Sequence, residues 1–361
     1  MSRPPRGHMS ELGSLLADTV TRLFNNLVTK ELIESAEKGV WPDKLWRALE
    51  EGGLTLPLVP ESRGGAGGAW SDAHVVVRAA GKHAAPVPLA ETIVAGWLLG
   101  EAALEVPLGP LTIAPVEGDE PLRLTRAGGG GWKVSGTASR VPWGGAAAHV
   151  VVVAEGDGGP MVALVARGAA RVVSDRNLAL EPRDTLVFDG APVVAAAAAG
   201  RRIGVDAVIL YGALVRAAQM AGALESLLEQ SARYATERRQ FGRPIGNFQA
   251  IQHNLALLAG HTAAAGMAAQ HAFDVADHTD PRRAVAAAKV RCGEAAGLGA
   301  GIAHQVHGAI GFTYEHSLHF STRRLWSWRA EFGSESRWAQ ALGRAAAARG
   351  AEHLWADLTA R

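Results

Sequence analysis

The chain has 361 residues, with 36 lysines and arginines against 35 aspartates and glutamates and a net charge of +1. This length predicts two or three domains around a large buried core. The balanced charge excludes the strongly basic surface that recruits nucleic acid or an anionic membrane, and a single cysteine, Cys292, excludes an internal disulfide.

The composition is typical of a cytoplasmic protein that has no membrane segment. No apolar stretch reaches membrane-spanning length without a charge or a glycine cluster, and the opening MSRPPRGHMSELG lacks the apolar centre of a signal peptide. Cys292 lies in a helical run, so we interpret it as a small buried apolar residue rather than a nucleophile.

Residues 1 to 106 are predicted to form a helical N-terminal domain. ELGSLLADTVTRLFNNLV repeats apolar residues at helical spacing, and WPDKLWRALEEGG is a shorter helix that ends in two glycines. VPESRGGAGGAW is a loop by composition. Ser71 and Asp72 are placed to cap the next helix, and LAETIVAGWLLGEAAL completes the domain.

Residues 107 to 198 change to a β pattern. Six short, mostly valine-rich runs are separated by Gly, Pro and Asp turns: LTIAPV, WKVSG, HVVVVAE, MVALVA, ARVVSD and DTLVFDG. Strands at this spacing predict a small antiparallel domain, either a sandwich or a barrel. We interpret the alanine-rich run VVAAAAAGRRIG as the joint to the last zone.

Residues 199 to 361 are predicted to form a C-terminal four-helix bundle. The first helix, from about 205 to 240, would be roughly 50 Å long, a length typical of a bundle. The starts of the other three carry capping signals, namely Asn247, the pair Asp280-Pro281, and Ser334 followed by Glu335. The predicted fold is therefore α+β and mainly α.

Two ordered motifs stand in this last zone. YATERRQFGRPIGNFQAIQ follows the long helix and gathers three arginines around a Phe-Gly turn, and QVHGAIGFTYEHSLHFSTRRL comes later. Together with LWRALEEGGLTLPLVPESRGGAGG near the start, and with the order of helices, β domain and bundle, they closely resemble the flavin-dependent acyl-CoA dehydrogenase family. The resemblance covers nearly the whole chain and is weakest in the β domain.

The resemblance implies that FAD lies across a subunit interface and that the residues after the long helix reach the neighbour's cofactor. Arg238 would bind the pyrophosphate with its forked donors. Gln240 would hydrogen-bond the cofactor, and Phe241 would pack on it. The further cofactor-binding residues implied are Phe248, Gln249, Gln305, Gly308 and Ala309, the last of which stands where the family has a second glycine.

Purely structural or surface roles stay open as alternatives for several of these residues. Arg238 is alternatively a solvated helix end, and Arg239 and Arg243 are better interpreted as surface or interface charges. His307, inside the second motif, is better interpreted as a helix-end or filling residue than as a catalyst. The aromatics of LWSWR are expected in the core or a subunit interface. No metal-ligand, phosphate-loop or serine-elbow motif occurs in the sequence.

The family's reaction needs a glutamate that removes an α-proton from an acyl-CoA thioester while a hydride leaves the β-carbon for the flavin. Loss of such a base typically costs about 10²–10⁴-fold in rate. The resemblance places the base at Phe332, or in a second family location at Gly212, and neither residue carries a carboxylate. Glu331 is the remaining catalytic candidate, although it is offset by one residue.

The β domain departs from the family in a related way. The family's Gly-Ser-Asp loop, which holds the flavin ring and the thioester, is replaced by the short connection DEPLRLTRAGG, and a family Trp-Thr pair corresponds to Arg140 and Pro142. The residues that would contact the flavin ring bound in the same subunit are therefore missing or replaced, whereas those that would contact the neighbouring subunit's FAD are present.

This asymmetry predicts a subunit of an FAD-dependent acyl-CoA dehydrogenase that acts on an acyl-CoA substrate. Its partner would be a related, glutamate-bearing chain in an α2β2 assembly, as in the bacterial members that oxidise steroid side-chain CoA esters. One alternative is a flavin-free scaffold or CoA-binding protein on the same fold. Another is a homomeric enzyme that uses Glu331 as its base.

Overall fold

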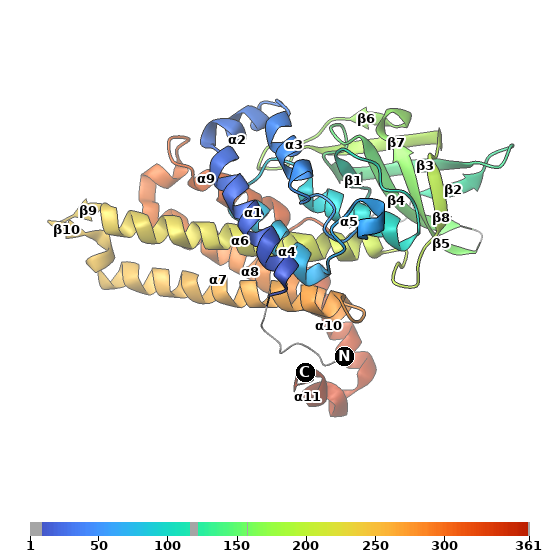
Figure 1. Ribbon diagram of the computed structural model, residues 1–361. Helices are drawn as coiled ribbons and strands as arrows, with labels where there is room; N and C mark the ends of the chain where they lie inside the picture. Colours follow the sequence, from blue (N-terminus) through green and yellow to red (C-terminus); the bar gives the residue numbers. More distant parts are fainter. Residues whose placement is uncertain (1–8, 116–121, 157, 360–361) are drawn as a thin grey trace.

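The computed structural model describes residues 9–115, 122–156 and 158–359 (Figure 1). Its first part is helical, as predicted. The helices are α1 (Glu11–Leu27), α2 (Lys30–Glu37), α3 (Asp43–Glu51), α4 (Trp70–Lys82) and α5 (Leu89–Glu101), with a 3-10 turn η1 (Glu61–Arg63) in the glycine-rich loop. Helix α4 begins at Trp70, before the predicted capping pair, and Asp72 caps it from inside the first turn by accepting the Ala69 N–H at 2.9 Å.

The middle of the described chain forms an eight-stranded sheet in the order β6-β7-β3-β2-β4-β5-β8, with β1 beside β4. Its strands are β1 (Leu111–Ile113), β2 (Arg123–Arg126), β3 (Trp132–Pro142), β4 (His149–Gly156), β5 (Gly159–Ala166), β6 (Arg171–Val173), β7 (Arg183–Pro192) and β8 (Ala195–Ala198), with a turn η2 (Arg167–Ala169). Both β1 and β2 pair with β4 in parallel, so the sheet is mixed rather than purely antiparallel.

Two of these strands are absent from the sequence-based prediction. Strand β8 lies in the alanine-rich run interpreted as a joint, and it pairs with Met161–Leu164 of β5. Because alanine has little strand propensity, this strand depends on its partner in the sheet rather than on its own residues. Strand β2 lies in the short connection, whose residues 119–121 are outside the described part.

The last part is helical apart from a small hairpin. It comprises α6 (Ala207–Glu237), the hairpin of β9 (Arg239–Gln240) and β10 (Arg243–Pro244), η3 (Ile245–Asn247), α7 (Gln249–Ala276), α8 (Arg282–His307), η4 (Gly308–Phe312), α9 (Leu318–Trp328), α10 (Glu335–Arg349) and α11 (Ala351–Thr359). Helix α9, which the predicted bundle lacks, packs against α6. Asn247 is not the N-cap of α7, because it ends η3 and Phe248 takes the cap position.

The N-terminal helices and the bundle share one hydrophobic core, and the strands enclose a second, smaller one. Glycines bring α4 and α6 together: a Cβ on Gly81 would lie 2.1 Å from the Gln219 carbonyl oxygen, and one on Gly222 would lie 2.0 Å from that of Arg78. Burial in this core raises the pKa of the Cys292 thiol to about 12, which agrees with its interpretation as a small apolar residue.

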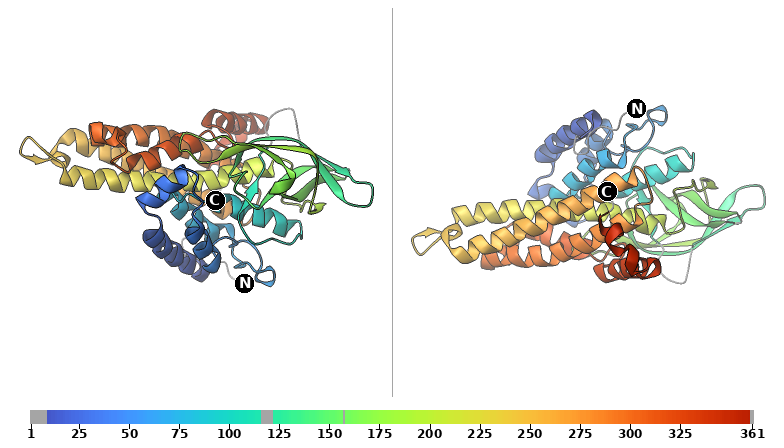
Figure 2. Two further views of the ribbon diagram at one scale, coloured as in Figure 1. Left: turned by 90° about the horizontal axis from the view of Figure 1, so that it is seen from above. Right: turned by 90° about the horizontal axis from the view of Figure 1, so that it is seen from below.

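Helix α6 is the one described helix long and apolar enough to cross a membrane, but its apolar window is 100% buried inside the protein. That is the environment of a core helix. Figures 1 and 2 show the sheet at one end of α6 and the β9–β10 hairpin at the other. The predicted domain boundaries after residues 106 and 198 fall between α5 and β1 and between β8 and α6; as domain boundaries they stay predictions.

Candidate functional site

The hairpin at the tip of the bundle has a strained turn. Phe241 and Gly242 both have positive φ, at 50° and 78°, as the two central residues of a tight two-residue hairpin require. Glycine adopts this conformation freely, whereas a bulky residue such as phenylalanine is strained in it. The Phe241 side chain is nevertheless 91% exposed. Strain combined with an exposed aromatic ring is typical of a contact or ligand site.

The same hairpin presents unpaired positive charge. Arg238 follows the last residue of α6, and its backbone is fixed because its N–H donates to the Tyr234 carbonyl and its carbonyl accepts the Ile245 N–H, both at 2.8 Å. Within the described residues its guanidinium makes no hydrogen bond or ion pair. Arg243, by contrast, is stacked 4.3 Å from the centre of the Phe248 ring. The free guanidinium of Arg238 therefore suits an anionic ligand.

The second predicted segment lies at the same end of the bundle as the hairpin. The turn from α8 into η4 exposes Gln305, Gly308 and Ala309, and Gly308 has a φ of 62° that favours glycine. The ring of His307, which ends α8, stacks on the ring of Tyr234 near the end of α6, with centroids 4.6 Å apart. The Tyr234–His307 contact therefore connects the end of α6, which leads into the hairpin, to the turn that follows α8.

The two predicted base positions face each other inside the protein. A Cβ built on Gly212 would lie 2.4 Å from Cδ1 of the Phe332 ring. Phe332 itself is only 5% exposed and has a φ of 53°. The ring thus fills the space that a side chain at 212 would need, and no carboxylate stands at either position.

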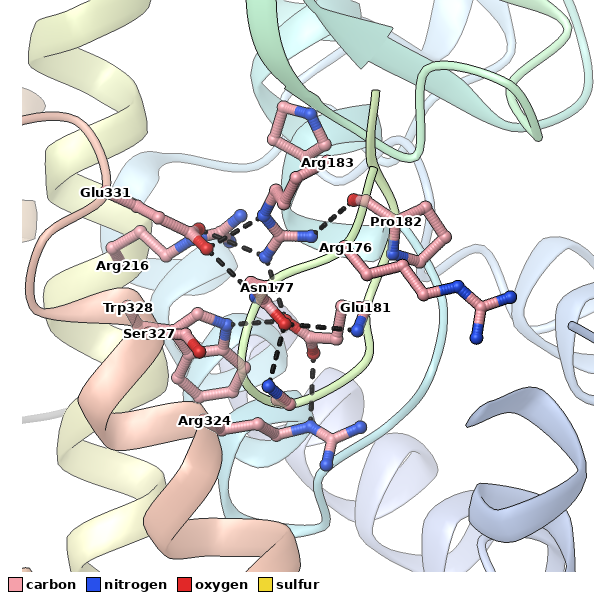
Figure 3. Close-up of polar contacts among 12 residues, drawn as sticks. Arg176, Asn177, Glu181, Pro182, Arg183, Arg216, Arg324, Ser327, Trp328 and Glu331 are labelled. Atoms are coloured by element: carbon pink, nitrogen blue, oxygen red, sulfur yellow. Dashed lines mark hydrogen bonds and ion pairs between the residues drawn. The ribbon is translucent and has the colours of Figure 1, made fainter. Parts of the chain in front are cut away.

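Glu331 lies beside this pair and is bound by two arginines (Figure 3). Its Oε1 accepts Arg183 Nε at 2.8 Å and Asn177 Nδ2 at 3.1 Å, and its Oε2 accepts Arg216 Nε at 2.7 Å and Arg183 Nη2 at 3.0 Å. Burial alone would raise the pKa of Glu331, but Arg183 and Arg216 outweigh it and hold that pKa well below its usual range. A carboxylate bound in this way is a weak proton acceptor.

These contacts belong to a larger buried ionic network that connects all parts of the fold. Arg216 of α6 also pairs with Glu91 of α5. Arg183 also pairs with Glu181 at 2.8 Å, and Glu181 pairs with Arg324 of α9 at 3.1 Å and accepts the Trp328 indole N–H at 2.9 Å. The buried ionic network, defined here as Glu91, Glu181, Arg183, Arg216, Arg324 and Glu331, contains equal numbers of positive and negative groups, which is what burial of charge requires.

Comparisons with known proteins agree with this fold. The acyl-CoA dehydrogenase N-terminal domain matches residues 10–104, and the C-terminal domain matches residues 200–350. Acyl-CoA dehydrogenase FadE27 of Mycobacterium tuberculosis is 32% identical over 342 residues, covering 86% of this chain and 89% of that protein. The chain belongs to the acyl-CoA dehydrogenase family.

Two solved structures resemble this acyl-CoA dehydrogenase along nearly its whole length. The ChsE4-ChsE5 complex from Mycobacterium tuberculosis has a TM-score of 0.84 at 27% identity, covering 93% of this chain and 97% of that one. The steroid ACAD Tcur3481-Tcur3483 has a TM-score of 0.83 at 27% identity, covering 92% and 97%. The predicted fold class and the prediction of an FAD-dependent acyl-CoA dehydrogenase are confirmed at the level of the family.

Sequence reasoning missed the buried ionic network. One signal was available: Arg216 is the sole charge in a run of apolar and small residues along α6, and a buried charge must find a partner. The partners could not be inferred, because Glu91 and Glu331 lie far from Arg216 in the sequence. Arg140 and Pro142, which replace the family's Trp-Thr pair, both lie in β3, and Arg140 has a φ of 55°.

Proposed function

We propose that this chain is one subunit of a heteromeric acyl-CoA dehydrogenase that desaturates an acyl-CoA thioester between its α and β carbons. It would contribute the pyrophosphate and adenosine half of an FAD site that lies across the subunit interface. The partner subunit would contribute the glutamate that removes the α-proton. Bound FAD supplies the hydride acceptor, and the residues of this chain bind and orient it.

The observation that carries this proposal is the contrast between two regions of the chain. At the hairpin, Arg238 is unpaired within the described residues and Phe241 is exposed and strained, so these groups fit a large anionic ligand with a flat ring. Inside the protein, Phe332 fills the space over Gly212, and Glu331 is neutralised by Arg183 and Arg216. The first region fits a cofactor, and the second does not fit proton abstraction.

Two solved relatives favour a partner chain of the same family, because one is the ChsE4-ChsE5 complex and the other carries the paired name Tcur3481-Tcur3483. One of them is named a steroid ACAD, so we propose a CoA ester of a steroid side chain as the substrate class. We also propose an α2β2 assembly, located in the cytoplasm. Between residues 249 and 273 the exposed face of α7 carries no Asp, Glu, Lys or Arg, and this face, with Leu257, Gly260 and Met267, suits helix packing against another subunit.

Two alternatives remain as outcomes of the test. A flavin-free scaffold or CoA-binding protein has no need of an unpaired guanidinium beside an exposed ring, which speaks against it. A homomeric enzyme using Glu331 would need that carboxylate released from Arg183 and Arg216, each of which contacts it within 3.0 Å. Such a release would leave buried charges uncompensated.

The decisive experiment is co-expression of this chain with the product of a neighbouring gene that carries the family glutamate. The complex should carry FAD, detected by its visible absorbance, and the chain alone should carry little. Arg238→Ala in the complex removes a charge-assisted contact of about 1.5–3 kcal/mol and should weaken FAD binding about ten- to hundred-fold.

Arg239→Ala is the matched control, because it removes the same charge from the same hairpin at a residue we assign to the surface. It should retain FAD. Full FAD retention by Arg238→Ala, or an FAD-replete and active enzyme made from this chain alone, would overturn the proposal.

A further inference from the structure

Four histidines gather where α8 meets η4 and α9. The histidine cluster consists of His304, His307, His316 and His319. The rings of His307 and His316 have centroids 4.7 Å apart, and His307 also stacks on Tyr234. The cluster therefore surrounds the turn Gly308–Phe312, which carries the exposed Gly308 and Ala309.

The surroundings of two of these rings favour the neutral form. His316 Nδ1 accepts the Leu318 N–H at 3.1 Å, so a proton on that nitrogen would oppose the first N–H of α9. His307 Nδ1 donates to the Ala303 carbonyl at 2.8 Å. The other ring nitrogen, Nε2 of His307, is buried and has no hydrogen-bond partner within the described part of the chain, so a proton there would have no acceptor.

The surrounding groups do not favour positive charge on the cluster. Lys30 of α2 donates to the carbonyls of Tyr314 and Glu315 at 3.1 and 3.0 Å, close to His316. Arg323 of α9 is paired with Glu37 at 2.6 Å. Glu34 pairs with Lys30 at 3.7 Å, and Tyr314 and Glu315, which precede His316 in the chain, are exposed. No carboxylate is hydrogen-bonded to a cluster ring within the described residues.

We propose that His307 and His316 are positioning residues for the turn Gly308–Phe312, and that protonation of this pair opens the turn. Because the Tyr234 carbonyl accepts the Arg238 N–H, the stack of Tyr234 on His307 connects the turn to the arginine of the hairpin. We define the FAD socket as Arg238 and Phe241 of the hairpin together with Gly308 and Ala309 of the turn. Opening the turn would separate these two parts of the FAD socket. This inference rests on the proposed function for its consequence, the release of FAD at low pH.

The direction of the pH dependence follows from the folded environment. Burial, followed by Lys30, lowers the pKa of His316 below its ordinary value of 6.5. Burial also lowers the pKa of His307, and the neighbouring His316 and His304 lower it further, against the opposing effect of the Ala303 hydrogen bond. The closed turn is therefore fully favoured above the ordinary pKa, and it loses stability as the pH falls below that value.

Hydrogen exchange of the chain, corrected for intrinsic exchange rates, tests the opening without FAD. Amides from 308 to 318 should lose protection about tenfold or more between about pH 7.5 and about pH 5.5. His316→Asn should suppress this loss, because the Asn side-chain oxygen accepts the N–H two residues ahead and does not titrate. His278→Asn, at an exposed residue after α7, is the control and should behave as the wild type.

Two results would overturn the inference: protection in the wild type that does not change with pH, or a loss that is equal in His316→Asn and wild type. His307→Phe, which keeps a ring against Tyr234 but cannot be protonated, provides a second variant and should also suppress the loss. FAD retention by the assembled complex over the same pH range separates this inference from the proposed function. Absence of FAD at every pH would reject the FAD socket. A pH-dependent hydrogen exchange of the turn would still support the role of His307 and His316 in holding it closed.

Discussion

The ring of Phe332 lies directly over the backbone of Gly212, so close that a Cβ on the glycine would be 2.4 Å from the ring. These two residues occupy the positions at which the resemblance to the family places the catalytic glutamate. They are complementary, because the helix residue has no side chain where the turn residue has a large one. The base location has thus become part of the hydrophobic core, in which Phe332 belongs to the same cluster as Tyr211 and Ala213.

Gly212→Ala should therefore destabilise the chain. The added methyl group would collide with a ring that cannot withdraw easily, since Phe332 is buried, and such overpacking typically costs about 1–3 kcal/mol. Chemical denaturation would measure this. The control is Gly260→Ala in α7, where nothing lies within 4 Å of the new Cβ, and alanine there should stabilise the helix by about 0.5–1 kcal/mol.

The double variant Gly212→Ala with Phe332→Ala tests the contact itself. If the two residues compete for one space, the cost of the alanine at 212 should largely disappear once the ring is removed. Equal costs in the presence and absence of the ring would contradict the steric explanation.

Glu331→Gln should leave turnover of the assembled enzyme almost unchanged while it lowers stability. The amide keeps the size of the side chain but removes the negative charge shared by Arg183 and Arg216, and breaking a buried ion pair from one side typically costs about 3–5 kcal/mol. Turnover per bound FAD and the denaturation midpoint would be compared with those of Glu315→Gln, an exposed glutamate. A collapse of turnover with FAD still bound would make this chain the catalytic subunit.

Much of the fold could be predicted, and the reason why some elements could not is physical. The valine-rich strands and the apolar face of α6 carry their own periodicity, so the β zone and the long helix are visible in the sequence. Strand β8 is four alanines that become a strand only beside β5. Helix α9 contains one histidine and two arginines, so its sequence resembles an exposed segment, although Arg324 is 1% exposed and ion-paired to Glu181.

The candidate site, like the fold, could be predicted from the sequence only in part. The exposed residues Arg238, Gln240 and Phe241 are recognisable because they stand together in one short motif. The groups that determine the state of Glu331 come from separate parts of the chain, with Arg183 at the start of β7 and Arg216 in α6. Only the folded chain brings them together, so sequence reasoning could keep Glu331 as a candidate base but could not see its ion pairs.

Acid should weaken the fold through His74 as well as through the histidine cluster. Burial, and then Arg78, lowers the pKa of His74 from 6.5 to about 4, and its Nε2 is buried without a partner among the described residues. The contribution of His74 to folded-state stability should be complete above its ordinary pKa, fall as the pH drops from about 6.5 to about 4, and level off below. A shift of this size corresponds to about 3 kcal/mol.

His74→Phe would check this effect. It keeps a ring beside Phe273, whose centroid lies 5.0 Å from that of His74, and it removes the titrating group. The acid limb of the stability curve should become shallower than that of the wild type. His271→Phe, at an exposed position of α7, should leave the limb as it is, and an unchanged limb in His74→Phe would assign the acid sensitivity elsewhere.

Phe241 offers the most direct separation of stability from function. Its positive φ strains a bulky residue, whereas glycine adopts that conformation without cost, so Phe241→Gly should leave the isolated chain as stable as the wild type or up to about 1 kcal/mol more stable. The ring is 91% exposed and lends the hairpin little packing. In the complex, however, the same substitution should reduce FAD retention, because the ring that would pack on the cofactor is gone.

Phe241→Leu, which keeps an apolar side chain at the same strained position, should retain FAD to an intermediate degree. Thermal unfolding of the isolated chain and flavin absorbance of the complex would be measured for all three proteins. If Phe241→Gly lowered the stability of the isolated chain and left FAD retention intact, Phe241 would be a structural residue. The FAD socket would then consist of Arg238 and the turn Gly308–Phe312 alone.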